Sequence, residues 1–357
     1  MFTGSNASQT LRGFLQSGVQ TGTGPFAVIR SKTMSAIPAS ASGPQPGSKY
    51  DRLIAAAKGV PMVSTVVVHP CDESSLRGAV ESAEAGIIKA ILVGPAARIK
   101  DVAAKYGLNI SGYEIVDTPP TEAAAANRGV ELIHEGRGEV LMKGSLHTDE
   151  IMRAVTAKTG GLRTDRRISH VFVMDVPAYA DTIFVTDAAI NIFPDLDAKR
   201  DIIQNAVDLF NQAGFGTTPR VAILSAVETV NSKIPSTIEA AALCKMADRR
   251  QITGALLDGP LAFDNAIDPE AARIKGIKSE VAGRAQILVV PDLESGNMLA
   301  KNLAYFAKAD GAGIVLGARV PVVLTSRADS ARARMASAAV AALYADARRR
   351  HAPIAAA

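Results

Sequence analysis

The sequence predicts an α/β protein with two lobes and parallel-rich sheets, and three observations support this prediction. Short apolar runs alternate with longer helix-forming stretches from residue 63 onward, which indicates parallel strands joined by right-handed crossovers. The chain has 357 residues, of which 48% are hydrophobic, so it is long enough for two lobes with cores of their own. A polar, glycine-rich stretch at 159–167 separates two such series of elements and marks the boundary between the lobes.

The first 48 residues differ in composition from the rest of the chain. Residues 1–48 contain no Asp or Glu and are rich in Ser, Gly, Thr and Ala. Such a composition cannot bury a core, so we expect a flexible leader. Two alternatives stay open, which are a transit peptide and an extension before a true start at Met34.

Each predicted lobe consists of alternating strands and helices. In the first lobe, residues 49–158, we expect strands at 63–70, 89–95 and 139–144 and helices at 73–86, 96–106, 121–135 and 148–158. In the second lobe, residues 159–317, we expect strands at 170–176, 181–190, 220–227, 254–261 and 285–291 and helices at 198–214, 236–250 and 297–309.

The C-terminal residues 318–357 hold one more strand, at 321–325, and one more helix. These are too few for a domain, so we expect them to return to the first lobe. That lobe is then discontinuous, 49–158 plus 318–357, with a cleft between the lobes.

Residues 311–317 look like a dinucleotide-binding loop, but their glycine spacing is wrong and a strand follows them instead of a helix, so we interpret them as a turn.

Composition excludes several classes of function. No apolar run reaches the roughly 18 residues of a membrane helix, so we expect a soluble, cytoplasmic protein with no membrane partner. Cys71 and Cys244 form no C-x-x-C pattern and the five histidines do not fall at ligand spacing, so we expect neither a disulfide framework nor a metal site. The net charge of +4 does not indicate a nucleic-acid partner, although it suits an anionic small molecule.

The strongest candidate site lies where the strand at 321–325 ends. Ser326 and Arg327 follow it directly, at the carboxyl end of a strand, where ligands bind in parallel sheets. The next helix offers free N–H groups to an anion, and an arginine binds phosphate through paired hydrogen bonds. Ser326 and Asp329 also fit a helix-start pattern in which Ser caps the first turn. Capping does not require Arg327, so the residues favour a phosphate site.

A second junction repeats this arrangement. The strand at 139–144 ends with Lys143 and Gly144, the loop SLHT follows, and we expect Thr148 to cap a helix that carries Arg153. Lys143 and Arg153 can then face an anion at the start of the helix. A solvated position for Arg153 is the alternative.

Two further loops carry polar residues at strand ends. We expect residues 291–302 to form a wall of the cleft, and a simple turn at 295–297 is the alternative. Their polar side chains are Asp292, Glu294, Asn297 and Lys301. Asp258 or Asp264 is a candidate base, although residues 258–260 are also typical of an ordinary turn.

The order of the motifs resembles a known family. The segments are LMKGSLHT, ADTIFVTDAAINIFPD, VNSKIPSTIEAAALCKMADR, LLDGPLAFDNAI, VVPDLESGNMLAKNL and GARVPVVLTSRADS. Over about residues 60–345 the chain resembles the phosphate acetyl/butyryltransferase family, especially its shorter butyryltransferase-like branch. The sequence has neither a G-x-x-x-x-G-K-S/T phosphate loop nor a G-x-S-x-G elbow, which argues against nucleotide hydrolysis and α/β-hydrolase chemistry.

The resemblance implies a two-lobed fold related to the isocitrate and isopropylmalate dehydrogenases, with the active site in the cleft between the lobes. It implies reversible transfer of a short acyl group, acetyl or butyryl, between coenzyme A and inorganic phosphate. Acyl-CoA and phosphate are then the substrates, no cofactor or metal is expected, and the protein is expected to be a homodimer.

The resemblance also implies roles for individual residues. Ser326 would hydrogen-bond the oxyanion or the leaving thiolate, and Arg327 would bind the phosphoryl group. Asp329 is the carboxylate nearest to the place where acetyltransferases of the family carry an acidic base, which Ala333 occupies here. If the base is lost, phosphate itself or Asp264 would replace it. The expected substrate-binding residues are Lys143, Gly144, His147, Thr148, Arg153 and Asn297.

Two other functions stay open. One is a nicotinamide- and metal-dependent hydroxy-acid dehydrogenase of the related fold, although the sequence shows no paired acidic motif for the metal. The other is a non-catalytic acyl-CoA-binding protein, which the absence of a carboxylate at Ala333 suggests.

Overall fold

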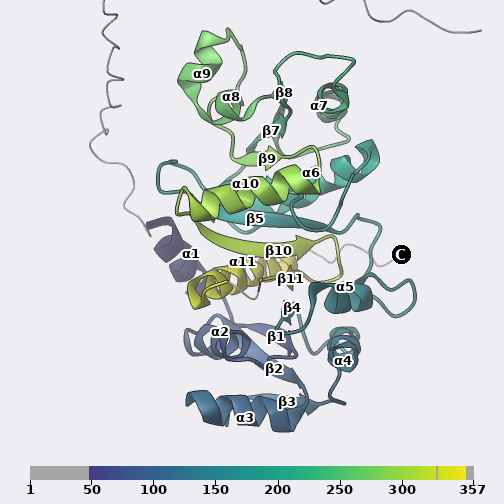
Figure 1. Cartoon of the computed structure of the whole chain (residues 1–357), viewed down its shortest axis with the longest axis vertical. Coiled ribbons are helices and arrows are strands. Elements are labelled where there is room, and N and C mark those ends of the chain that lie inside the picture. Colours follow the sequence, from purple (N-terminus) through teal and green to yellow (C-terminus); the bar gives the residue numbers. More distant parts are fainter. Residues whose placement is uncertain (1–47, 327–328, 351–357) are drawn as a thin grey trace, which may run out of the picture. The chain divides into compact units, whose positions relative to one another are not determined.

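A single sheet runs through the part of the chain that the structure describes. The structure is a computed structural model and describes residues 48–326 and 329–350. Its strands are β1 (Val63–Val68), β2 (Ile88–Gly94), β3 (Glu114–Asp117), β4 (Val140–Lys143), β5 (Ser169–Asp175), β6 (Ile183–Thr186), β7 (Arg220–Leu224), β8 (Leu256–Leu261), β9 (Ile287–Val289), β10 (Asp310–Leu316) and β11 (Val322–Val323). They lie in the order β3-β2-β1-β4-β11-β10-β5-β6-β9-β7-β8 (Figure 1).

Two groups of parallel strands make up this sheet. In the first group β3, β2, β1, β4 and β11 pair in parallel, and in the second group β6, β9, β7 and β8 do so. Between the groups, β10 and β5 pair antiparallel with each other and with their outer neighbours. The predicted α/β class with a large, parallel-rich sheet is therefore confirmed.

The antiparallel pairs depart from the parallel pairing that the alternation of strands and helices predicts. The segment 176–182 joins β5 to β6, and the segment 317–321 joins β10 to β11. Both are too short to hold the crossover helix that a parallel pair requires. Short connections therefore fix the antiparallel direction of the β5–β6 and β10–β11 pairs.

The interpretation of residues 311–317 as a turn is wrong. Asp310–Leu316 is the strand β10, and the turn follows it at Gly317, whose φ of 82° favours glycine. Gly313 is required inside the strand because a Cβ there would lie 2.6 Å from the carbonyl oxygen of Leu324. The glycines thus permit a close approach of two backbones.

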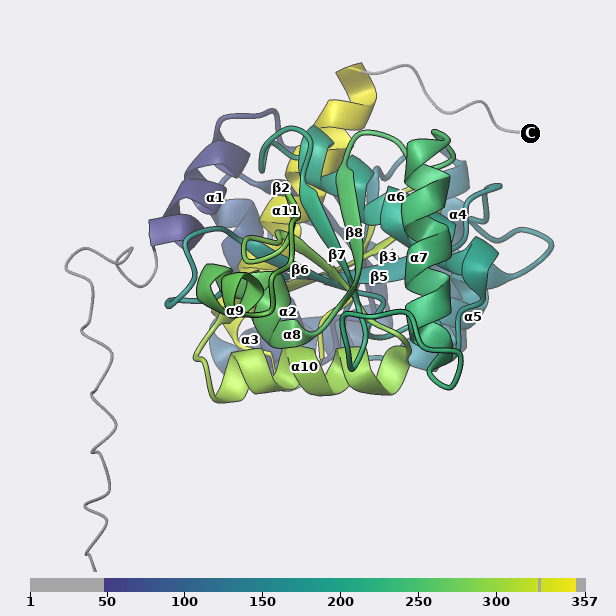
Figure 2. The ribbon, with the colours of Figure 1, turned by 90° about the horizontal axis from the view of Figure 1, so that it is seen from above.

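Helices cover both faces of the sheet (Figure 1, Figure 2). One face carries α1 (Ser48–Lys58), α2 (Glu73–Glu84), α3 (Ala96–Tyr106), α6 (Leu196–Gln212), α7 (Pro235–Asp248) and α11 (Ala331–Arg350). The other face carries α4 (Glu122–His134), α5 (Thr148–Thr156), α8 (Phe263–Ile267), α9 (Pro269–Ile274) and α10 (Leu293–Tyr305). The sequence did not predict α1, α8, α9 or the edge strand β3, and every other helix and strand except β10 overlaps its predicted range.

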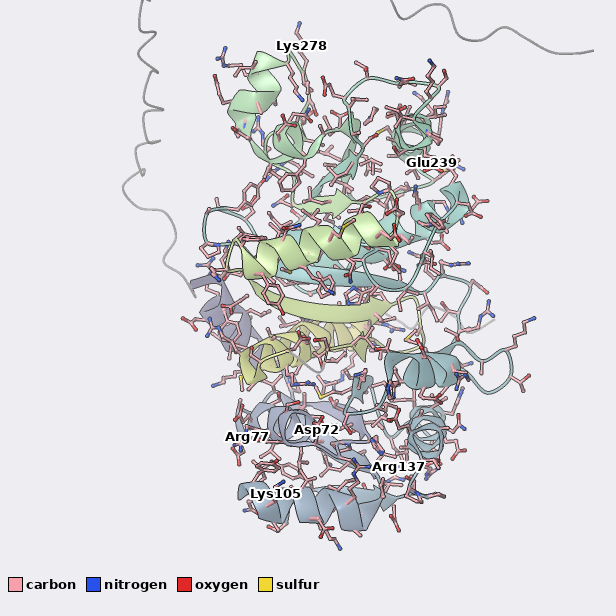
Figure 3. All side chains as sticks on the ribbon, viewed as in Figure 1. Asp72, Arg77, Lys105, Arg137, Glu239 and Lys278 are labelled. Atoms are coloured by element: carbon pink, nitrogen blue, oxygen red, sulfur yellow. The ribbon has the colours of Figure 1, made fainter. Side chains whose placement is uncertain are left out.

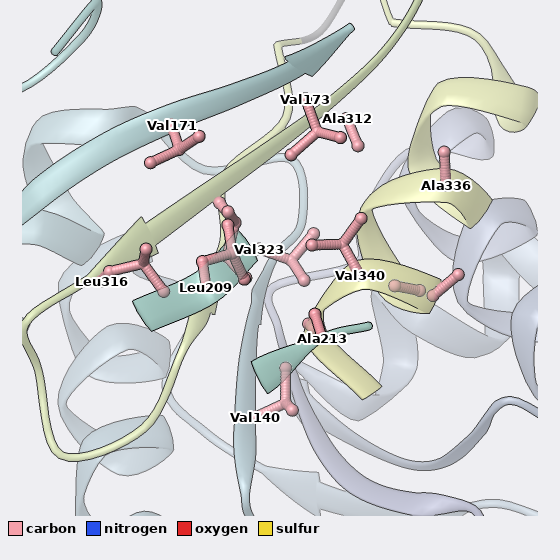
Figure 4. Close-up of a cluster of buried hydrophobic side chains, with 14 of the residues drawn as sticks. Val140, Val171, Val173, Leu209, Ala213, Ala312, Leu316, Val323, Ala336 and Val340 are labelled. Atoms are coloured by element: carbon pink, nitrogen blue, oxygen red, sulfur yellow. The ribbon is translucent and has the colours of Figure 1, made fainter. Parts of the chain in front are cut away.

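Alternate residues of each strand face the two layers of helices. Val67 belongs to the buried cluster under α1, α2 and α11, whereas its neighbours Val66 and Val68 belong to the cluster under α4 and α5. Figure 4 shows part of the first cluster, and the side chains of Val173 in β5 and Val340 in α11 are labelled there. Because both faces are covered, the central strands are mostly apolar, and burial of each apolar side chain contributes about 1.5–3 kcal/mol.

The C-terminal elements lie against the first elements of the chain. β11 pairs with β4, and α11 packs on α1 and α2. The predicted lobes, 49–158 plus 318–357 and 159–317, contribute strands to one sheet, and the division between them stays a prediction. Apart from Ser48, which begins α1, the predicted leader 1–48 lies outside the described residues. Within those residues, no helix has both the length and the apolar content to cross a membrane.

Candidate active site

The candidate site lies where three neighbouring parallel strands of the first group end. β1, β4 and β11 are adjacent and parallel, so the residues that follow them emerge at the same edge of the sheet. From β1 the chain continues to β2 on one side, whereas β4 lies on the other side. In open α/β sheets ligands bind where neighbouring connections diverge in this way.

Two buried cations hold the backbone that follows β11. Lys143 donates from Nζ to the carbonyl oxygen of Thr325 at 3.3 Å. Arg334, in the first turns of α11, donates from Nη1 to the hydroxyl of Thr325 at 2.7 Å and from Nη2 to the carbonyl oxygen of Ser326 at 2.9 Å. Lys143 and Thr325 are each 3% exposed and Arg334 is 5% exposed. The backbone carbonyl groups of Thr325 and Ser326, the two residues before Arg327, therefore each accept a hydrogen bond from a buried cation.

Ser326 forms a tight turn with Asp329. The Asp329 carboxylate accepts hydrogen bonds from the Ser326 N–H at 2.6 Å and from the Ser326 hydroxyl at 3.2 Å. The helix α11 begins later, at Ala331, and Ser330 caps it by accepting from the N–H of Ala333 at 3.2 Å. The alternative in which Ser326 caps the helix is therefore wrong, and the Ser326 side chain lies in an exposed turn.

Arg327, the predicted phosphate ligand, lies outside the described residues, as does its neighbour at 328. The residues on both sides of it are described. Ser326 and Asp329 are joined by the hydrogen bonds given above, and the N–H of Asp329 also donates to the carbonyl oxygen of Ser326 at 3.2 Å. The role of Arg327 therefore stays a prediction.

The loop after β4 packs directly on the loop after β1. The N–H of Gly144 donates to the carbonyl oxygen of Val68 at 2.8 Å, and a Cβ at Gly144 would lie 2.4 Å from that oxygen. The hydroxyl of Ser145 donates to the carbonyl oxygen of His69 at 2.8 Å and accepts from the N–H of Cys71 at 3.2 Å. Glycine is thus required at 144 to bring the two loops together.

The segment after this loop differs in detail from its prediction. α5 begins at Thr148, so His147 occupies the capping position that we expected for Thr148. The Glu122 carboxylate accepts from the His147 N–H at 2.8 Å and lies 2.9 Å from its Nδ1. Burial raises the pKa of Glu122, but the two hydrogen bonds from His147 outweigh this effect and the pKa is lowered. Glu122 therefore holds the start of α5 as a carboxylate.

Arg153 occupies a solvated position on α5. Its side chain is 69% exposed, and Nη1 donates to Glu150 one turn earlier at 2.7 Å. Exposed pairs of this kind stabilise a helix by a few tenths of a kcal/mol. The geometry therefore agrees with the solvated alternative, and phosphate binding by Arg153 stays a prediction.

A group of polar residues at the end of β1 was not predicted from the sequence. Asp72, labelled in Figure 3, caps α2 by accepting from the N–H of Ser75 at 2.8 Å. Burial raises the pKa of Asp72, but the hydrogen bonds from Ser75 outweigh it and the pKa is lowered. Ser74 accepts from Nη2 of Arg334 at 3.2 Å. The polar run His-Pro-Cys-Asp directly after an apolar strand is the signal that would have found them.

Asn297 and its neighbours belong to the second group of strands. α10 begins at Leu293, and Asp292 caps it in a reciprocal arrangement with Ser295, so residues 295–297 form the first turn of a helix and the simple turn is wrong. Nδ2 of Asn297 donates to the carbonyl oxygen of Ala188 at 3.3 Å. A substrate contact of Asn297 stays a prediction.

The two carboxylates considered as alternative bases are differently placed. Asp258 lies inside β8 together with Gly259 and Pro260, so the ordinary turn expected at 258–260 is wrong. Asp264 pairs with Lys275 at 3.3 Å. The hydrogen bond from the Asn265 backbone and the pairing with Lys275 lower the pKa of Asp264, which makes it a weaker base.

No group of three or more His, Cys, Asp or Glu side chains in residues 48–326 and 329–350 is arranged to hold a metal ion. Both cysteines are free thiols. Burial raises the pKa of Cys71 to about 11 and that of Cys244 to about 12. Neither thiol therefore has the thiolate character of a nucleophile near neutral pH.

Comparison with known proteins adds three relatives. A family model described as phosphate acetyl/butaryl transferase matches residues 120–342. A phosphate acetyltransferase from Rhizobium meliloti is 70% identical over 313 residues, or 88% of this chain and 98% of that protein. A phosphate butyryltransferase from Clostridium beijerinckii is 42% identical over 296 residues, or 83% of this chain and 97% of that protein. The structure of a branched-chain phosphotransacylase from Enterococcus faecalis V583 has a TM-score of 0.69 and 28% identity, and the match covers 80% of this chain and 99% of that chain.

Proposed function

Because this chain belongs to the phosphate acetyl/butyryltransferase family, we propose that the edge formed by β1, β4 and β11 transfers an acyl group between coenzyme A and inorganic phosphate. The family membership confirms the resemblance of the motifs and the enzyme class, acyltransferase. Relatives named as phosphate acyltransferases favour this activity over a dehydrogenase and over a non-catalytic protein. One observation supports this location of the active site: two buried cations, Lys143 and Arg334, hold the backbone at Thr325 and Ser326.

The reaction in the direction of acyl phosphate requires charge stabilisation. A phosphate oxygen attacks the thioester carbonyl carbon, the C–S bond breaks, and coenzyme A leaves as a thiolate that takes up a proton. We assign the phosphate to Arg327, which can bind it through two parallel hydrogen bonds. We assign the developing oxyanion or the leaving thiolate to the Ser326 hydroxyl, and a donor of this kind is worth about 3 kcal/mol.

The reverse direction requires a base, because the thiol must lose its proton before it attacks. The Ser326 hydroxyl donates to the Asp329 carboxylate at 3.2 Å. A thiol that donates to Ser326 Oγ can therefore pass its proton to Asp329 through the hydroxyl. Such proton transfer contributes about a hundredfold to ten-thousandfold in rate. We propose Asp329 as the base. Position 333 is an alanine, so Asp329 is the carboxylate nearest to the place where family members carry an acidic residue.

The loop after β4 completes the proposal. We propose that Lys143 supports the substrate site from within the sheet and that Gly144, His147 and Thr148 line it, with Asn297 on the opposite wall of a cleft between the two lobes. Close packing of this loop on the residues after β1 supports the arrangement. Arg153 is the weakest member of the set because its side chain pairs with Glu150 in solvent.

We infer that acetyl-CoA is the preferred substrate. The relative from Rhizobium meliloti, a phosphate acetyltransferase, shares 70% identity, whereas the butyryltransferase from Clostridium beijerinckii shares 42%. Each methylene in an apolar pocket changes discrimination by about 1–3 kcal/mol. Propionyl-CoA and butyryl-CoA should therefore react more slowly, in that order.

We propose that the enzyme works in the cytoplasm as a homodimer, with acyl-CoA and phosphate as substrates and no further cofactor. Two free cysteines are typical of a reducing compartment. Exposed aromatic side chains at Phe193 and Phe306 are typical of residues that a partner covers. Sedimentation equilibrium of the full chain gives its mass directly, and a monomer at micromolar concentration would contradict the dimer.

The experiment that tests the function is thiol release from acetyl-, propionyl- and butyryl-CoA in the presence of phosphate. Arg327→Ala should raise the KM for phosphate about a hundredfold, with little change in the KM for acetyl-CoA. Ser326→Ala should lower kcat about a hundredfold to a thousandfold. Arg273→Ala is the matched control because Arg273 is an exposed arginine of α9 that pairs with Glu270.

Three outcomes would contradict the proposal. A wild-type enzyme that releases no coenzyme A from any of these thioesters would remove acyl transfer altogether. Wild-type kinetics in Arg327→Ala and Ser326→Ala would move the site away from β11. An unchanged rate of acetyl-CoA synthesis from acetyl phosphate in Asp329→Asn would remove Asp329 as the base.

A further inference from the structure

Arg334 is buried in a way that a purely structural side chain does not require. It is 5% exposed, and its side chain donates to hydroxyl and carbonyl oxygens of the described residues instead of to a carboxylate. Its Nε has no hydrogen-bond partner among those residues. Burial lowers the pKa of Arg334, and the charges of Asp329 and Asp72 oppose this effect. A buried cation without an ion pair costs several kcal/mol, which an apolar side chain of similar length would avoid.

The three side-chain hydrogen bonds that Arg334 makes with described residues all connect to the candidate site. Nη1 donates to the Thr325 hydroxyl, and Nη2 donates to the Ser326 carbonyl oxygen and to the Ser74 hydroxyl. Thr325 and Ser326 follow β11, whereas Ser74 lies in the first turn of α2, after β1. One side chain of α11 thus joins the loops at the ends of two strands of the site.

The helix α2 leaves space for this side chain. A Cβ at Gly78 would lie 2.8 Å from Cδ of Arg334, so the aliphatic part of the arginine passes where α2 has no side chain. Ser74 lies one turn earlier on the same helix and accepts from its guanidinium group. Gly78 thus leaves room for the aliphatic part of Arg334, and Ser74 accepts a hydrogen bond from its guanidinium group.

We propose that Arg334 is a positioning residue for acyl transfer. It fixes the backbone at Thr325 and Ser326, so that the Ser326 hydroxyl acts on the thioester from a fixed place. Its positive charge beneath the turn also strengthens the attraction of the site for phosphate. This inference rests on the proposed function, and the loss of positioning by about 1 Å costs an enzyme about a hundredfold in rate.

The test compares two substitutions at 334 with a control on the same helix. Arg334→Met removes the charge and the hydrogen bonds, and Arg334→Lys keeps the charge but loses the planar fork. Arg332→Met is the control because Arg332 lies in the first turn of α11, pairs with Asp310 at 2.8 Å and is partly exposed. Steady-state kinetics in the thiol-release assay, thermal unfolding and amide hydrogen exchange of the peptide 321–330 are measured for each protein.

We expect Arg334→Met to lower kcat about a hundredfold and to raise the KM for phosphate about tenfold, while the KM for acetyl-CoA changes less than twofold. Arg334→Lys should lower kcat about tenfold, because a lysine cannot hold both groups. The melting temperature of Arg334→Met should stay near that of the wild type, since the loss of hydrogen bonds is offset by the loss of a buried charge. Arg332→Met should retain wild-type kinetics.

Wild-type kinetics in Arg334→Met or Arg334→Lys would overturn the inference. A loss of activity that disappears when the assay is cooled below the melting transition of the variant would also overturn it, because the arginine would then act on folding alone. If the wild type shows no acyl transfer, the proposed function fails and hydrogen exchange decides the positioning role. The Ser326 and Asp329 amides should then exchange about tenfold faster in Arg334→Met than in the wild type, and equal exchange would overturn the inference.

Discussion

Lys143 Nζ lies 3.3 Å from the carbonyl oxygen of Thr325, a residue 182 positions later in the chain. The lysine ends β4, and the threonine follows β11, the parallel neighbour of β4. The same ammonium group also lies 3.3 Å from the carbonyl oxygen of Gly144. A single buried cation thus holds the ends of two strands in register at the proposed site.

The first prediction concerns this lysine. Lys143→Met should lower kcat/KM about tenfold to a hundredfold, because the Thr325 carbonyl group loses its charged donor and the turn that carries Ser326 gains freedom. Lys89→Met on β2 is the matched control, since Lys89 is exposed. Thiol-release kinetics measure both variants, and equal kcat/KM values for the two would show that Lys143 has no part in the site.

The second prediction concerns the backbone contact between the loops after β1 and β4. Gly144→Ala should lower the free energy of unfolding by about 2 kcal/mol or more, because the new Cβ would lie 2.4 Å from the Val68 oxygen and 2.5 Å from the His69 oxygen. Gly112→Ala is the control, since a Cβ there meets no atom within 4 Å. Urea unfolding measures the difference. Equal midpoints would mean that the loops separate without cost.

Much of the fold follows from local patterns in the sequence. The alternation of strand and helix identifies β1, α2, β2 and α3 in order, because each has its own apolar periodicity. The strand β10 was missed because its glycines, at 311 and 313, are typical of turns. Gly313 is required by its contact with the backbone of Leu324, and no local pattern contains such a contact.

The candidate site was predicted only in part, because local patterns identify some of its residues and tertiary contacts place the others. Ser326 and Lys143 directly follow or end apolar strands, so the rule for strand ends identifies them. Arg334 sits within an alanine-rich helix, where an arginine usually faces solvent. Its burial depends on the packing of α11 against Gly78 of α2, which is a tertiary relationship. Local patterns therefore identify the residues at the edge of the sheet, but they do not identify Arg334, which is buried behind that edge.

The third prediction concerns the two thiols. With pKa values raised to about 11 and about 12, Cys71 and Cys244 are thiols at pH 8, where a free cysteine is about one-quarter thiolate. Labelling of the native enzyme by iodoacetamide at pH 8 should therefore be about a hundredfold slower than labelling in urea. Acyl transfer should persist in enzyme incubated with the reagent. Labelling is followed by mass spectrometry, and rapid native labelling would contradict the buried position of Cys71 and the partly buried position of Cys244.

The fourth prediction concerns stability in acid. Burial lowers the pKa of His170 from 6.5 to about 3, and its ring packs edge-on against Phe172 with centroids 4.4 Å apart. Between about pH 6.5 and pH 3 the unfolded chain binds a proton that the folded chain does not bind, so the free energy of unfolding falls as the pH falls. The expected slope is about 1.4 kcal/mol per pH unit for this residue, and above the unfolded pKa the effect is constant.

A substitution isolates this contribution from that of the carboxylates, which titrate in the same range. His170→Leu removes the titrating group and the Nδ1 atom that has no hydrogen-bond partner among the described residues. The difference in free energy of unfolding between wild type and His170→Leu should therefore shrink or change sign as the pH falls from 7 toward 4. If the curve of His170→Leu ran parallel to that of the wild type, His170 would take up its proton equally in the folded and the unfolded chain, which would contradict the prediction.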